Sequence, residues 1–311
     1  MLVDVALLWE WEFDEDFVKL LDRKFNQFGL QCYLIHPFNL PKLESDLNKQ
    51  AFAARVFYDR ASDANPAFEP IVQHLLQMES CPLNDPGALE TALDKAIMHS
   101  KLIEHGIHVP YTIILTPNRD WTKIKIGELI RLGEPFIIKP ALGGGGVGVE
   151  ANAKTLFDIV KAREAKGKEC LLLQEKVLPI QFGNRRAWFR IFYVCGKVIS
   201  CWWDDLTHIY FQLTPEEEKV YGLERLRNVV QRIAEISRLN FFSTEIAIVD
   251  KETFVAVDYV NDQCDMRLKS RFPDGVPDEV VEDITLEIAQ YVRRTILSKG
   301  RTLRLADSLS G

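Results

Sequence analysis

The 311-residue sequence contains no run of about 18 apolar residues, and it therefore predicts no membrane-spanning helix. Its first residues, MLVDVALLWEWEFDED, lack the basic start of a secretory signal and reach carboxylates at once. The six cysteines form no CxxC pair, which argues against both a zinc site and a disulfide framework. We therefore expect reduced thiols and a cytoplasmic location.

Positive charge is also in short supply. The sequence has 38 Lys and Arg against 45 Asp and Glu, and the net charge of -7 disfavours a large nucleic-acid surface, although it is compatible with a local basic cleft. The P-loop pattern GxxxxGK[ST] is absent, which excludes that class of nucleotide site. With 47% hydrophobic residues, the chain is long enough to bury a core divided between two or three compact units.

The first third of the chain alternates strands and helices. Apolar segments VDVALL, QCYLIH and ARVFYD are predicted strands, separated by predicted helices over 15–28 and, after the third, 67–78. This βαβ pattern predicts a small parallel sheet. From Val109 onwards, strands follow one another closely, which predicts mostly antiparallel sheets. The predicted fold class is therefore α+β, with an N-terminal α/β unit.

Longer helices are expected at four places in the remaining sequence. These are 88–105, 154–166, 215–239 and 273–298, the last being followed by a polar tail. The changes in pattern divide the chain into an N-terminal domain, a lid subdomain, a C-terminal subdomain and a tail. Their predicted ranges are 1–88, 89–174, 175–300 and 301–311.

The strongest local signal is a glycine loop, which we define as residues 143–148. Adjacent glycines allow backbone N–H groups to turn toward one anion, as in phosphate-binding loops. The loop also satisfies GxGxxG, but a Rossmann site needs a helix directly afterwards, and here the alternating residues predict a returning strand. A protein-kinase loop is excluded because Lys139 precedes the glycines. The glycines concerned are Gly143, Gly144, Gly145, Gly146 and Gly148.

Three charged residues lie within apolar strands and are candidates for binding an anion or a metal ion. Lys139 lies within PFIIKP, where a lysine must reach solvent or find an anion, such as a phosphate held by the glycine loop. Glu245 and Asp258 lie 13 residues apart on two strands joined by a tight turn, so the carboxylates can face one another. Such a pair requires a shared proton or cation, and Mg²⁺ prefers oxygen ligands of this kind.

The order PFIIKP, GGGGVGV, LLLQEKV and two acidic strand ends resembles the ATP-grasp superfamily. Within it, the pattern is similar to that of D-alanine–D-alanine ligase and the ribosomal-protein glutamate ligases, over roughly residues 88 to 290. The resemblance implies an ATP-grasp fold, in which two α+β subdomains clasp ATP behind an N-terminal α/β (pre-ATP-grasp) domain. It also implies ATP and Mg²⁺, as two ions, and formation of a C–N bond.

The resemblance assigns the nucleotide contacts residue by residue. Lys95 follows an aspartate in the position of the family's first phosphate lysine, Lys139 matches the second, and the glycine loop matches the lid over the phosphates. The family's ribose-binding acid is expected near Phe182 and is missing here. The hinge that contacts adenine is assigned to Gln174, Glu175, Lys176 and Val177.

The resemblance also assigns catalytic and metal-binding roles. Arg190 matches the arginine that the glutamate ligases place on the transferred phosphoryl group, and an arginine fork suits that charge. The metal ligands are assigned to Glu245, Asp258 and Asn261, although the family's asparagine follows its second acid by two residues and Asn261 follows by three. Asp262 and Asp265 are alternatives for the third ligand.

The acceptor half departs from the family. Ser243 stands where the ligases commonly carry a basic residue, and the segment 262–267 replaces their Ser-Pro-Gly-like loop. Arg267, in that segment, is the candidate to supply the missing positive charge and is assigned a catalytic role. The sequence therefore predicts an intact ATP site of the family's type beside an acceptor site that differs from the family's.

The predicted function is an ATP-dependent carboxylate–amine or carboxylate–thiol ligase, which forms an acyl phosphate and releases ADP and phosphate. Alternatives are a small-molecule kinase on the same scaffold and a non-catalytic ATP-binding regulator. The expected substrates are a small carboxylate, an amino acid or a peptide. No nucleic-acid or membrane partner is expected, and a homodimer is left open.

The glycine loop generates a first testable expectation. Residues 143–148 should exchange their amide hydrogens rapidly without nucleotide and slowly with a non-hydrolysable ATP analogue, because a lid orders when it closes over phosphates. Hydrogen-exchange mass spectrometry measures this, with the helix over 67–78 as an internal reference. Identical exchange of the loop with and without the analogue would reject its role as a lid.

Overall fold

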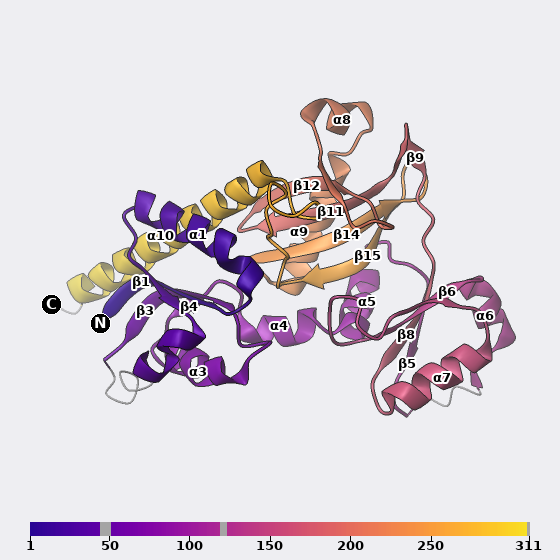
Figure 1. Ribbon diagram of the computed structural model, residues 1–311, viewed down its shortest axis with the longest axis horizontal. Helices are drawn as coiled ribbons and strands as arrows, with labels where there is room; N and C mark the ends of the chain where they lie inside the picture. Colours follow the sequence, from indigo (N-terminus) through magenta and orange to yellow (C-terminus); the bar gives the residue numbers. More distant parts are fainter. Residues whose placement is uncertain (44–50, 119–122, 310–311) are drawn as a thin grey trace.

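The computed structural model describes residues 1–43, 51–118 and 123–309 (Figure 1). Its strands form three larger sheets and one two-stranded ribbon. None of the helices in the described residues combines the length and apolar character needed to cross a membrane. All six cysteines are free thiols. The predicted α+β class is confirmed, with a parallel sheet at the N-terminus and antiparallel sheets after it.

The N-terminal sheet is parallel, with the order β2-β1-β3-β4. Helix α1 (Glu15–Gln27) forms because its apolar residues recur at helical spacing, and they pack on one face of the sheet beside α10 (Asp278–Leu309). Helix α3 (Glu69–Gln77) covers the other face. The strands are β1 (Leu2–Trp9), β2 (Cys32–Ile35), β3 (Ala53–Arg60) and β4 (Cys81–Pro82).

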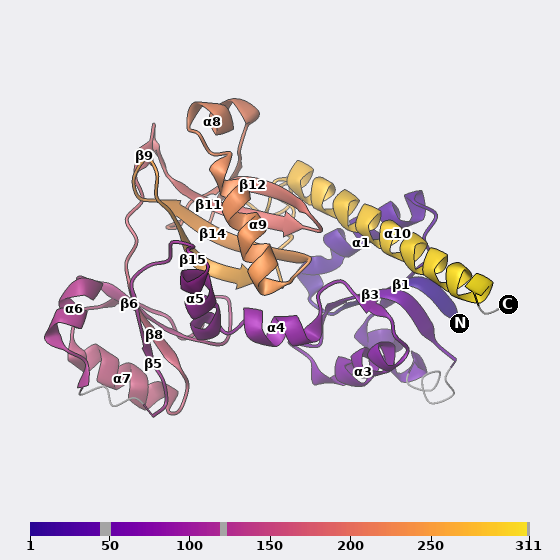
Figure 2. The ribbon, with the colours of Figure 1, turned by 180° about the vertical axis from the view of Figure 1, so that it is seen from behind.

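The small sheet, which we call the lid sheet, has the order β5-β8-β6-β7 and is antiparallel. Helices α6 (Ile126–Leu132) and α7 (Leu156–Lys166) accompany it (Figures 1 and 2). Phe136 and Ile138 enter the core on the helix side, so strand alternation sends Lys139 to the opposite face. The strands are β5 (Thr112–Leu115), β6 (Phe136–Pro140), β7 (Glu150–Ala153) and β8 (Leu171–Glu175).

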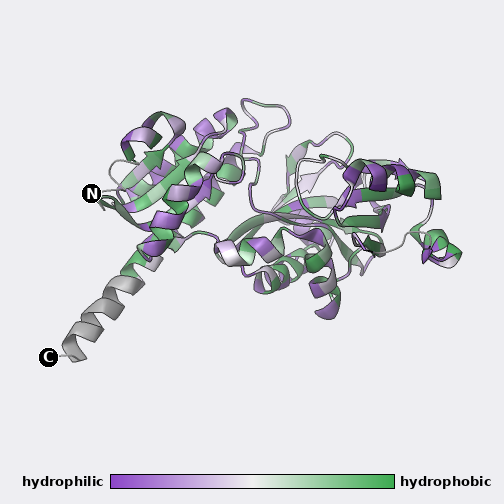
Figure 3. Cartoon of the chain, turned by 90° about the horizontal axis from the view of Figure 1, so that it is seen from below, coloured by the Kyte–Doolittle hydropathy of each residue, from purple (hydrophilic) through white to green (hydrophobic). Residues whose placement is uncertain are grey.

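The large sheet is antiparallel, with the order β13-β12-β11-β14-β15. One face is covered by α4 (Pro86–Ala92), α5 (Lys95–Glu104) and α9 (Arg225–Ser237), and α8 (Pro215–Val220) projects from the same part of the molecule (Figure 1). Hydrophobic residues mark its strands, while the helices carry residues of both kinds (Figure 3). The strands are β11 (Trp188–Val194), β12 (Lys197–Trp203), β13 (Tyr210–Gln212), β14 (Phe241–Ile248) and β15 (Phe254–Asn261).

Three predicted helices differ from the observed ones. The helix expected over 88–105 is two helices, because Asp94 accepts hydrogen bonds from the backbone N–H groups of Ala96 and Ile97 and so starts α5 at Lys95. The helix expected over 215–239 is likewise divided into α8 and α9, near Gly222, whose φ is 64°.

The last helix begins later and ends later than expected. Helix α10 runs from Asp278 to Leu309 and so takes in most of the predicted tail, of which residues 310–311 lie outside the described residues. Sequence analysis also missed the short elements α6, β13 and a ribbon formed by β9 (Gln181–Phe182) and β10 (Arg185–Arg186). The four-part division of the chain stays a prediction.

A buried ion pair joins the N-terminal sheet to the C-terminal part of the chain. Arg60, at the end of β3, makes two hydrogen bonds to the Asp14 carboxylate, at 2.8 and 2.7 Å. Its guanidinium also donates to the Tyr58 hydroxyl, at 2.9 Å, and to the carbonyl of Cys264, at 3.0 Å. Arg60 stands at the end of a strand, where open α/β sheets bind ligands, but here its donors bind the protein itself.

Breaking this pair should destabilise the fold. Asp14→Asn keeps the size of the side chain but leaves the Arg60 guanidinium without its buried counter-charge, and the free energy of unfolding should fall by about 3 kcal/mol. Chemical denaturation of the purified protein measures this. The matched control is Lys19→Ala, which breaks an exposed ion pair with Glu15 on the same helix and should leave stability unchanged. Equal stability of the two variants would contradict the stabilising role of the Asp14–Arg60 pair.

Candidate functional site

Three charged side chains form a row across the middle of the large sheet. Arg190 on β11 pairs with Glu245 on β14, and Glu245 pairs with Asp258 on β15, so all three side chains point from the same face. Nη1 of Arg190 lies 2.9 Å from Oε1 of Glu245 and 3.8 Å from Oδ2 of Asp258. The two predicted metal ligands are therefore adjacent, as their spacing suggested, and in this structure the arginine stands between them.

The row is held in place by its surroundings. Glu245 also accepts a hydrogen bond from Nε1 of Trp188, at 3.0 Å. Burial raises the pKa of Glu245, and the positive charge of Arg190 opposes that rise while Asp258 adds to it. Nε and Nη1 of Arg190 are buried and have no hydrogen-bond partner, even though Nη1 is within ion-pair distance of Glu245. Arg190 is therefore paired with Glu245 by charge, and its Nε is a buried donor without a hydrogen-bond partner.

A β-bulge explains the unusual position of Asn261. The register of β14 and β15 shifts between Ser243 and Glu245, where one residue of β14, Thr244, lies opposite two of β15, Tyr259 and Val260. The extra residue brings Asn261 opposite Ser243 and therefore onto the face that carries Glu245 and Asp258. Among the described residues, no group of three His, Cys, Asp or Glu side chains is placed to hold a metal ion. The Asn261 side chain lies on the same face as the two predicted carboxylate ligands.

Lys139 connects the lid sheet to the large sheet. Its side chain is only 8% exposed, and its Nζ donates to the carbonyl of Val257 on β15, at 3.2 Å. The ammonium also lies 5.5 Å from the centre of the Tyr259 ring. Burial lowers the pKa of Lys139, while the carboxylates of Asp258 and Glu245 oppose that shift. The predicted phosphate lysine is therefore beside the charged row.

Lys95 and the glycine loop lie together. Lys95 is the first residue of α5, its backbone N–H donates to the carbonyl of Ala141 at 2.9 Å, and its Nζ donates to the carbonyl of Gly143. The loop joins β6 to β7, which is the returning strand that the sequence predicts. Gly145 and Gly146 have φ values of 61° and 72°, a conformation in which a side chain would be strained.

The predicted hinge leaves β8 and leads toward the large sheet. The Gln174 side chain is buried against the large sheet, and its Oε1 has no hydrogen-bond partner. Oε1 of Glu175 accepts from the backbone N–H of Tyr111, at 2.7 Å. Lys176 is exposed, whereas Val177 packs in the apolar cluster that includes Ala247 of β14. The hinge therefore combines the unpaired Oε1 of Gln174 with the apolar side chain of Val177.

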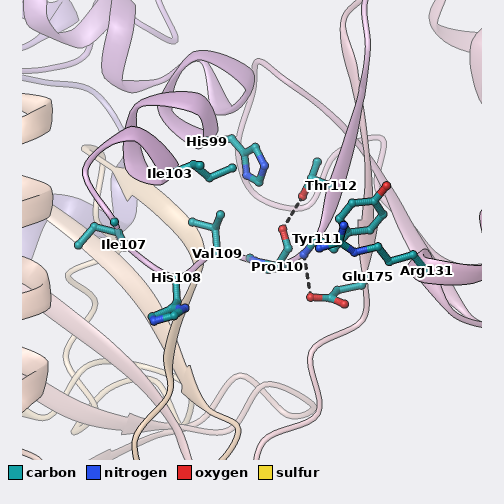
Figure 4. Close-up of a pocket in the computed structure, with 11 residues that line it drawn as sticks. His99, Ile103, Ile107, His108, Val109, Pro110, Tyr111, Thr112, Arg131 and Glu175 are labelled. Atoms are coloured by element: carbon teal, nitrogen blue, oxygen red, sulfur yellow. Dashed lines mark hydrogen bonds between the residues drawn. The ribbon is translucent and has the colours of Figure 1, made fainter. Parts of the chain in front are cut away.

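A hollow of about 540 Å³ lies beside the hinge (Figure 4). It is lined by the end of α5, the segment 106–112, Arg131 and Glu175. The guanidinium of Arg131 stacks over the Tyr111 ring, 4.0 Å from its centre. Among the described residues that line the hollow, Glu175 is a predicted ATP contact, and the phosphate lysines and metal ligands are not included. The hollow is thus adjacent to the predicted site and distinct from its charged part.

Two polar residues of this region were missed by sequence analysis. Tyr259 and His99 are buried, and the Tyr259 hydroxyl lies 2.7 Å from Nδ1 of His99 and 3.1 Å from Nε2 of Gln174. Burial and the nearby Lys139 charge lower the pKa of His99 to about 4, so the ring is neutral at neutral pH. Their positions among apolar residues are typical of core packing, so the pattern carries no signal for them.

The residues predicted to form the acceptor site have different charge partners from those predicted to bind ATP. Arg267 forms ion pairs with Asp265, at 2.7 Å, and Asp274, at 2.9 Å, so its charge is already balanced. Asp265, an alternative third metal ligand, is occupied by that pair. Asp262 is buried, and burial together with the neighbouring Asp63 raises its pKa to about 6. The positive charge expected from Arg267 is therefore paired with the carboxylates of Asp265 and Asp274.

Comparison of the sequence finds short similarities to curated ligases. No family model matches the chain. It is 34% identical over 80 residues to D-alanine–D-alanine ligase of Mycobacterium sp. (strain KMS), covering 25% of this chain and 21% of that protein. It is 31% identical over 126 residues to D-alanine–D-alanine ligase A of Bacillus cereus, covering 35% and 41%. The matched part is thus about a fifth of the first relative's length and two fifths of the second's.

Comparison of the structure finds similarity over nearly the whole chain. D-alanine–D-alanine ligase from Bacillus anthracis, complexed with ATP, superposes with a TM-score of 0.62 at 14% identity, covering 96% of this chain and 99% of that one. The RimK domain ATP-grasp protein of Sphaerobacter thermophilus gives 0.63 at 20% identity, covering 93% and 98%. ATP-grasp ligase PsnB, complexed with a precursor variant, Mg and ADP, gives 0.60 at 13% identity, covering 94% and 99%.

These superpositions extend through the N-terminal sheet, the lid sheet and the large sheet, because they cover more than nine tenths of the chain. At such identities the likeness is one of fold. The resemblance inferred from the residues is confirmed at that level, and the chain has the ATP-grasp fold.

Proposed function

We propose that the protein is an ATP-dependent ligase, which joins a carboxylate to an amine or a thiol through an acyl phosphate. The observation that supports this most directly is the charged row of Arg190, Glu245 and Asp258, with Lys139 placed beside it from the facing sheet. A cluster of two cations and two carboxylates between two sheets suits the binding and transfer of a phosphoryl group.

The unpaired atoms of the site fit a nucleotide triphosphate. The buried Nε and Nη1 of Arg190 have no hydrogen-bond partner, although Nη1 lies within ion-pair distance of Glu245, and both can donate to an anionic oxygen. Lys139 and Lys95 add two ammonium groups on the side of the glycine loop. We assign phosphate binding to these three cations and the glycine loop.

The hinge fits the adenine base. The unpaired Oε1 of Gln174 is an acceptor that can receive an amino group, and Glu175 provides a second carboxylate oxygen beside the one bound to Tyr111. Val177 is assigned to pair with the base through its backbone. Lys176 is assigned to the same hinge. The ribose contact stays unassigned, because Phe182 occupies the expected position.

Glu245, Asp258 and Asn261 would hold Mg²⁺, because their side chains share one face and offer the hard oxygen ligands that this ion prefers. When bound, Mg²⁺ offsets the negative charge of the phosphate oxygens. We propose two ions, as the resemblance implies. In the metal-free protein, Arg190 balances the two carboxylates, and its guanidinium is then free to turn toward the phosphate when another cation replaces it.

In the proposed reaction, a carboxylate oxygen of the substrate attacks the γ-phosphorus of ATP, and the bond to the ADP oxygen breaks. Arg190, Lys139 and Lys95 offset the charge that develops on the phosphoryl oxygens. An amine or thiol then attacks the acyl carbon, loses its proton, and displaces phosphate together with the former carboxylate oxygen. Arg267 is assigned to the acceptor side of this reaction, where Asp265 and Asp274 hold its guanidinium in place.

The substrate class follows from the same comparison and is part of the proposal. We infer a small carboxylate, an amino acid or a peptide, in line with the named ligases of the same fold. A cytoplasmic location is consistent with six free thiols. The homodimer, and the lack of nucleic-acid and membrane partners, stay predictions.

The test of this function is a screen for ADP release. Wild-type protein with ATP and Mg²⁺ is given pools of amino acids and small carboxylates, and ADP, free phosphate and phosphorylated products are measured together. A ligase should release ADP and phosphate in equal amounts only with the correct pool. ADP with a stable phospho-product would indicate the kinase alternative, and nucleotide binding without turnover in any pool would favour the regulator.

Loss of the Lys139 ammonium should weaken nucleotide binding. Lys139→Ala removes a buried, charge-assisted contact with the phosphates, and the affinity for ATP should fall by about 1.5–3 kcal/mol. Isothermal titration calorimetry measures this, and the affinity for adenosine should change much less. Lys161→Ala, at an exposed position of α7, is the control. A folded Lys139→Ala protein with unchanged ATP affinity would reject the role of Lys139.

Asp258 should matter mainly for turnover. Asp258→Asn keeps the shape but removes one negative charge from the metal pair, so catalysis should fall by about 100-fold or more while ATP affinity changes little. ADP production is measured beside a nucleotide titration. Asp250→Asn, in the turn of the same hairpin, is the control and should retain activity. Full activity of Asp258→Asn would show that the carboxylate pair is structural.

A further inference from the structure

A chain of buried hydrogen bonds is centred on the Tyr259 hydroxyl. This oxygen lies 2.7 Å from Nδ1 of His99 and 3.1 Å from Nε2 of Gln174. Nε2 of Gln174 also donates to the Thr112 hydroxyl, at 3.0 Å, which in turn donates to the carbonyl of Pro110. His99, Gln174 and Tyr259 are at most 4% exposed. The chain therefore joins α5, the two lid strands β5 and β8, and β15.

The directions of these hydrogen bonds can be derived. The amide nitrogen of Gln174 can only donate, so the Tyr259 oxygen accepts from it. With the hydrogen of the neutral His99 ring on Nε2, Nδ1 accepts the hydroxyl hydrogen of Tyr259. The Tyr259 hydroxyl then both accepts and donates a hydrogen bond. Removing the hydroxyl would leave a buried donor and a buried acceptor unpaired.

Each partner of Tyr259 either is a proposed nucleotide contact or lies one helical turn from one. His99 lies one helical turn after Lys95 on α5, Gln174 precedes Glu175 at the hinge, and Tyr259 itself follows Asp258. The ammonium of Lys139 lies over the Tyr259 ring, 5.5 Å from its centre.

We propose that Tyr259 is a positioning residue, which holds the phosphate lysines, the hinge and the metal-binding strand in one fixed arrangement. The hydroxyl anchors the hinge and α5, and the ring supports Lys139. This inference rests on the proposed function, because it assigns to Tyr259 the alignment of groups that bind ATP. It follows that the hinge, which binds the base, and the lysines, which bind the phosphates, move together.

The two parts of the side chain act on different parts of the ligand, and this makes the proposal testable. The hydroxyl contacts Gln174, so its loss should weaken binding of any ligand that carries adenine. The ring contacts Lys139, so its loss should additionally weaken only ligands that carry phosphates. A tyrosine that merely fills the core would affect both classes of ligand equally.

The experiment compares Tyr259→Phe and Tyr259→Leu with wild type, using calorimetric titrations of adenosine, ADP and ATP with Mg²⁺. Tyr259→Phe should weaken adenosine and ATP alike, by about tenfold, as expected for two lost buried hydrogen bonds. Tyr259→Leu should weaken ADP and ATP by a further factor of about five, without a further loss for adenosine. Tyr193→Phe, on the same sheet and stacked on Phe242, is the matched control and should bind as wild type.

A second measurement keeps the proposal falsifiable if Tyr259→Leu does not fold. Gln174→Leu combined with Tyr259→Phe should weaken adenosine by less than the sum of the two single losses, because one hydrogen bond is removed by both substitutions. Wild-type affinity in Tyr259→Phe, additive losses in the double variant, or equal losses for adenosine and ATP in Tyr259→Leu would each overturn the proposal. Failure of wild-type protein to bind ATP would instead refute the proposed function, and this inference with it.

Discussion

A single buried ammonium group, that of Lys139, links the two sheets between which the proposed site is built. The lysine comes from the lid sheet and is 8% exposed, and its Nζ contacts the carbonyl of Val257 on the large sheet. A charge in that position is stable only if opposite charges are near. Glu245 and Asp258 provide them, and these two carboxylates in turn require Arg190. The charged residues of the site therefore depend on one another, which explains why both sheets meet at this place.

Charges are also balanced differently in the two predicted halves of the site, the ATP-binding half and the acceptor half. In the ATP half, Arg190 is paired with Glu245 and Asp258, and its buried Nε has no hydrogen-bond partner. In the acceptor half, the guanidinium of Arg267 is held by Asp265 and Asp274. Asp262 adds a buried carboxyl with a raised pKa.

The strands and the charged row could be predicted because their signals are local. Apolar segments such as those around Leu7 and Ile138 are buried strands, and the spacing of Glu245 and Asp258 places them on one hairpin. Other features depend on contacts between distant segments. The position of Asn261 depends on a bulge that β14 and β15 form together, and Tyr259 has its partners on three other elements. No pattern within one segment of the sequence could have indicated these.

The central claim is that the protein activates a carboxylate by phosphorylation, and the path of one oxygen atom tests it most directly. Protein, ATP and Mg²⁺ are incubated with amino acids whose carboxylates carry oxygen-18, and the released phosphate is analysed by mass spectrometry. The proposed acyl phosphate transfers one labelled oxygen from the carboxylate to phosphate, so labelled phosphate should appear in step with ADP. Release of ADP with unlabelled phosphate, or with a phosphorylated hydroxyl product, would contradict the account.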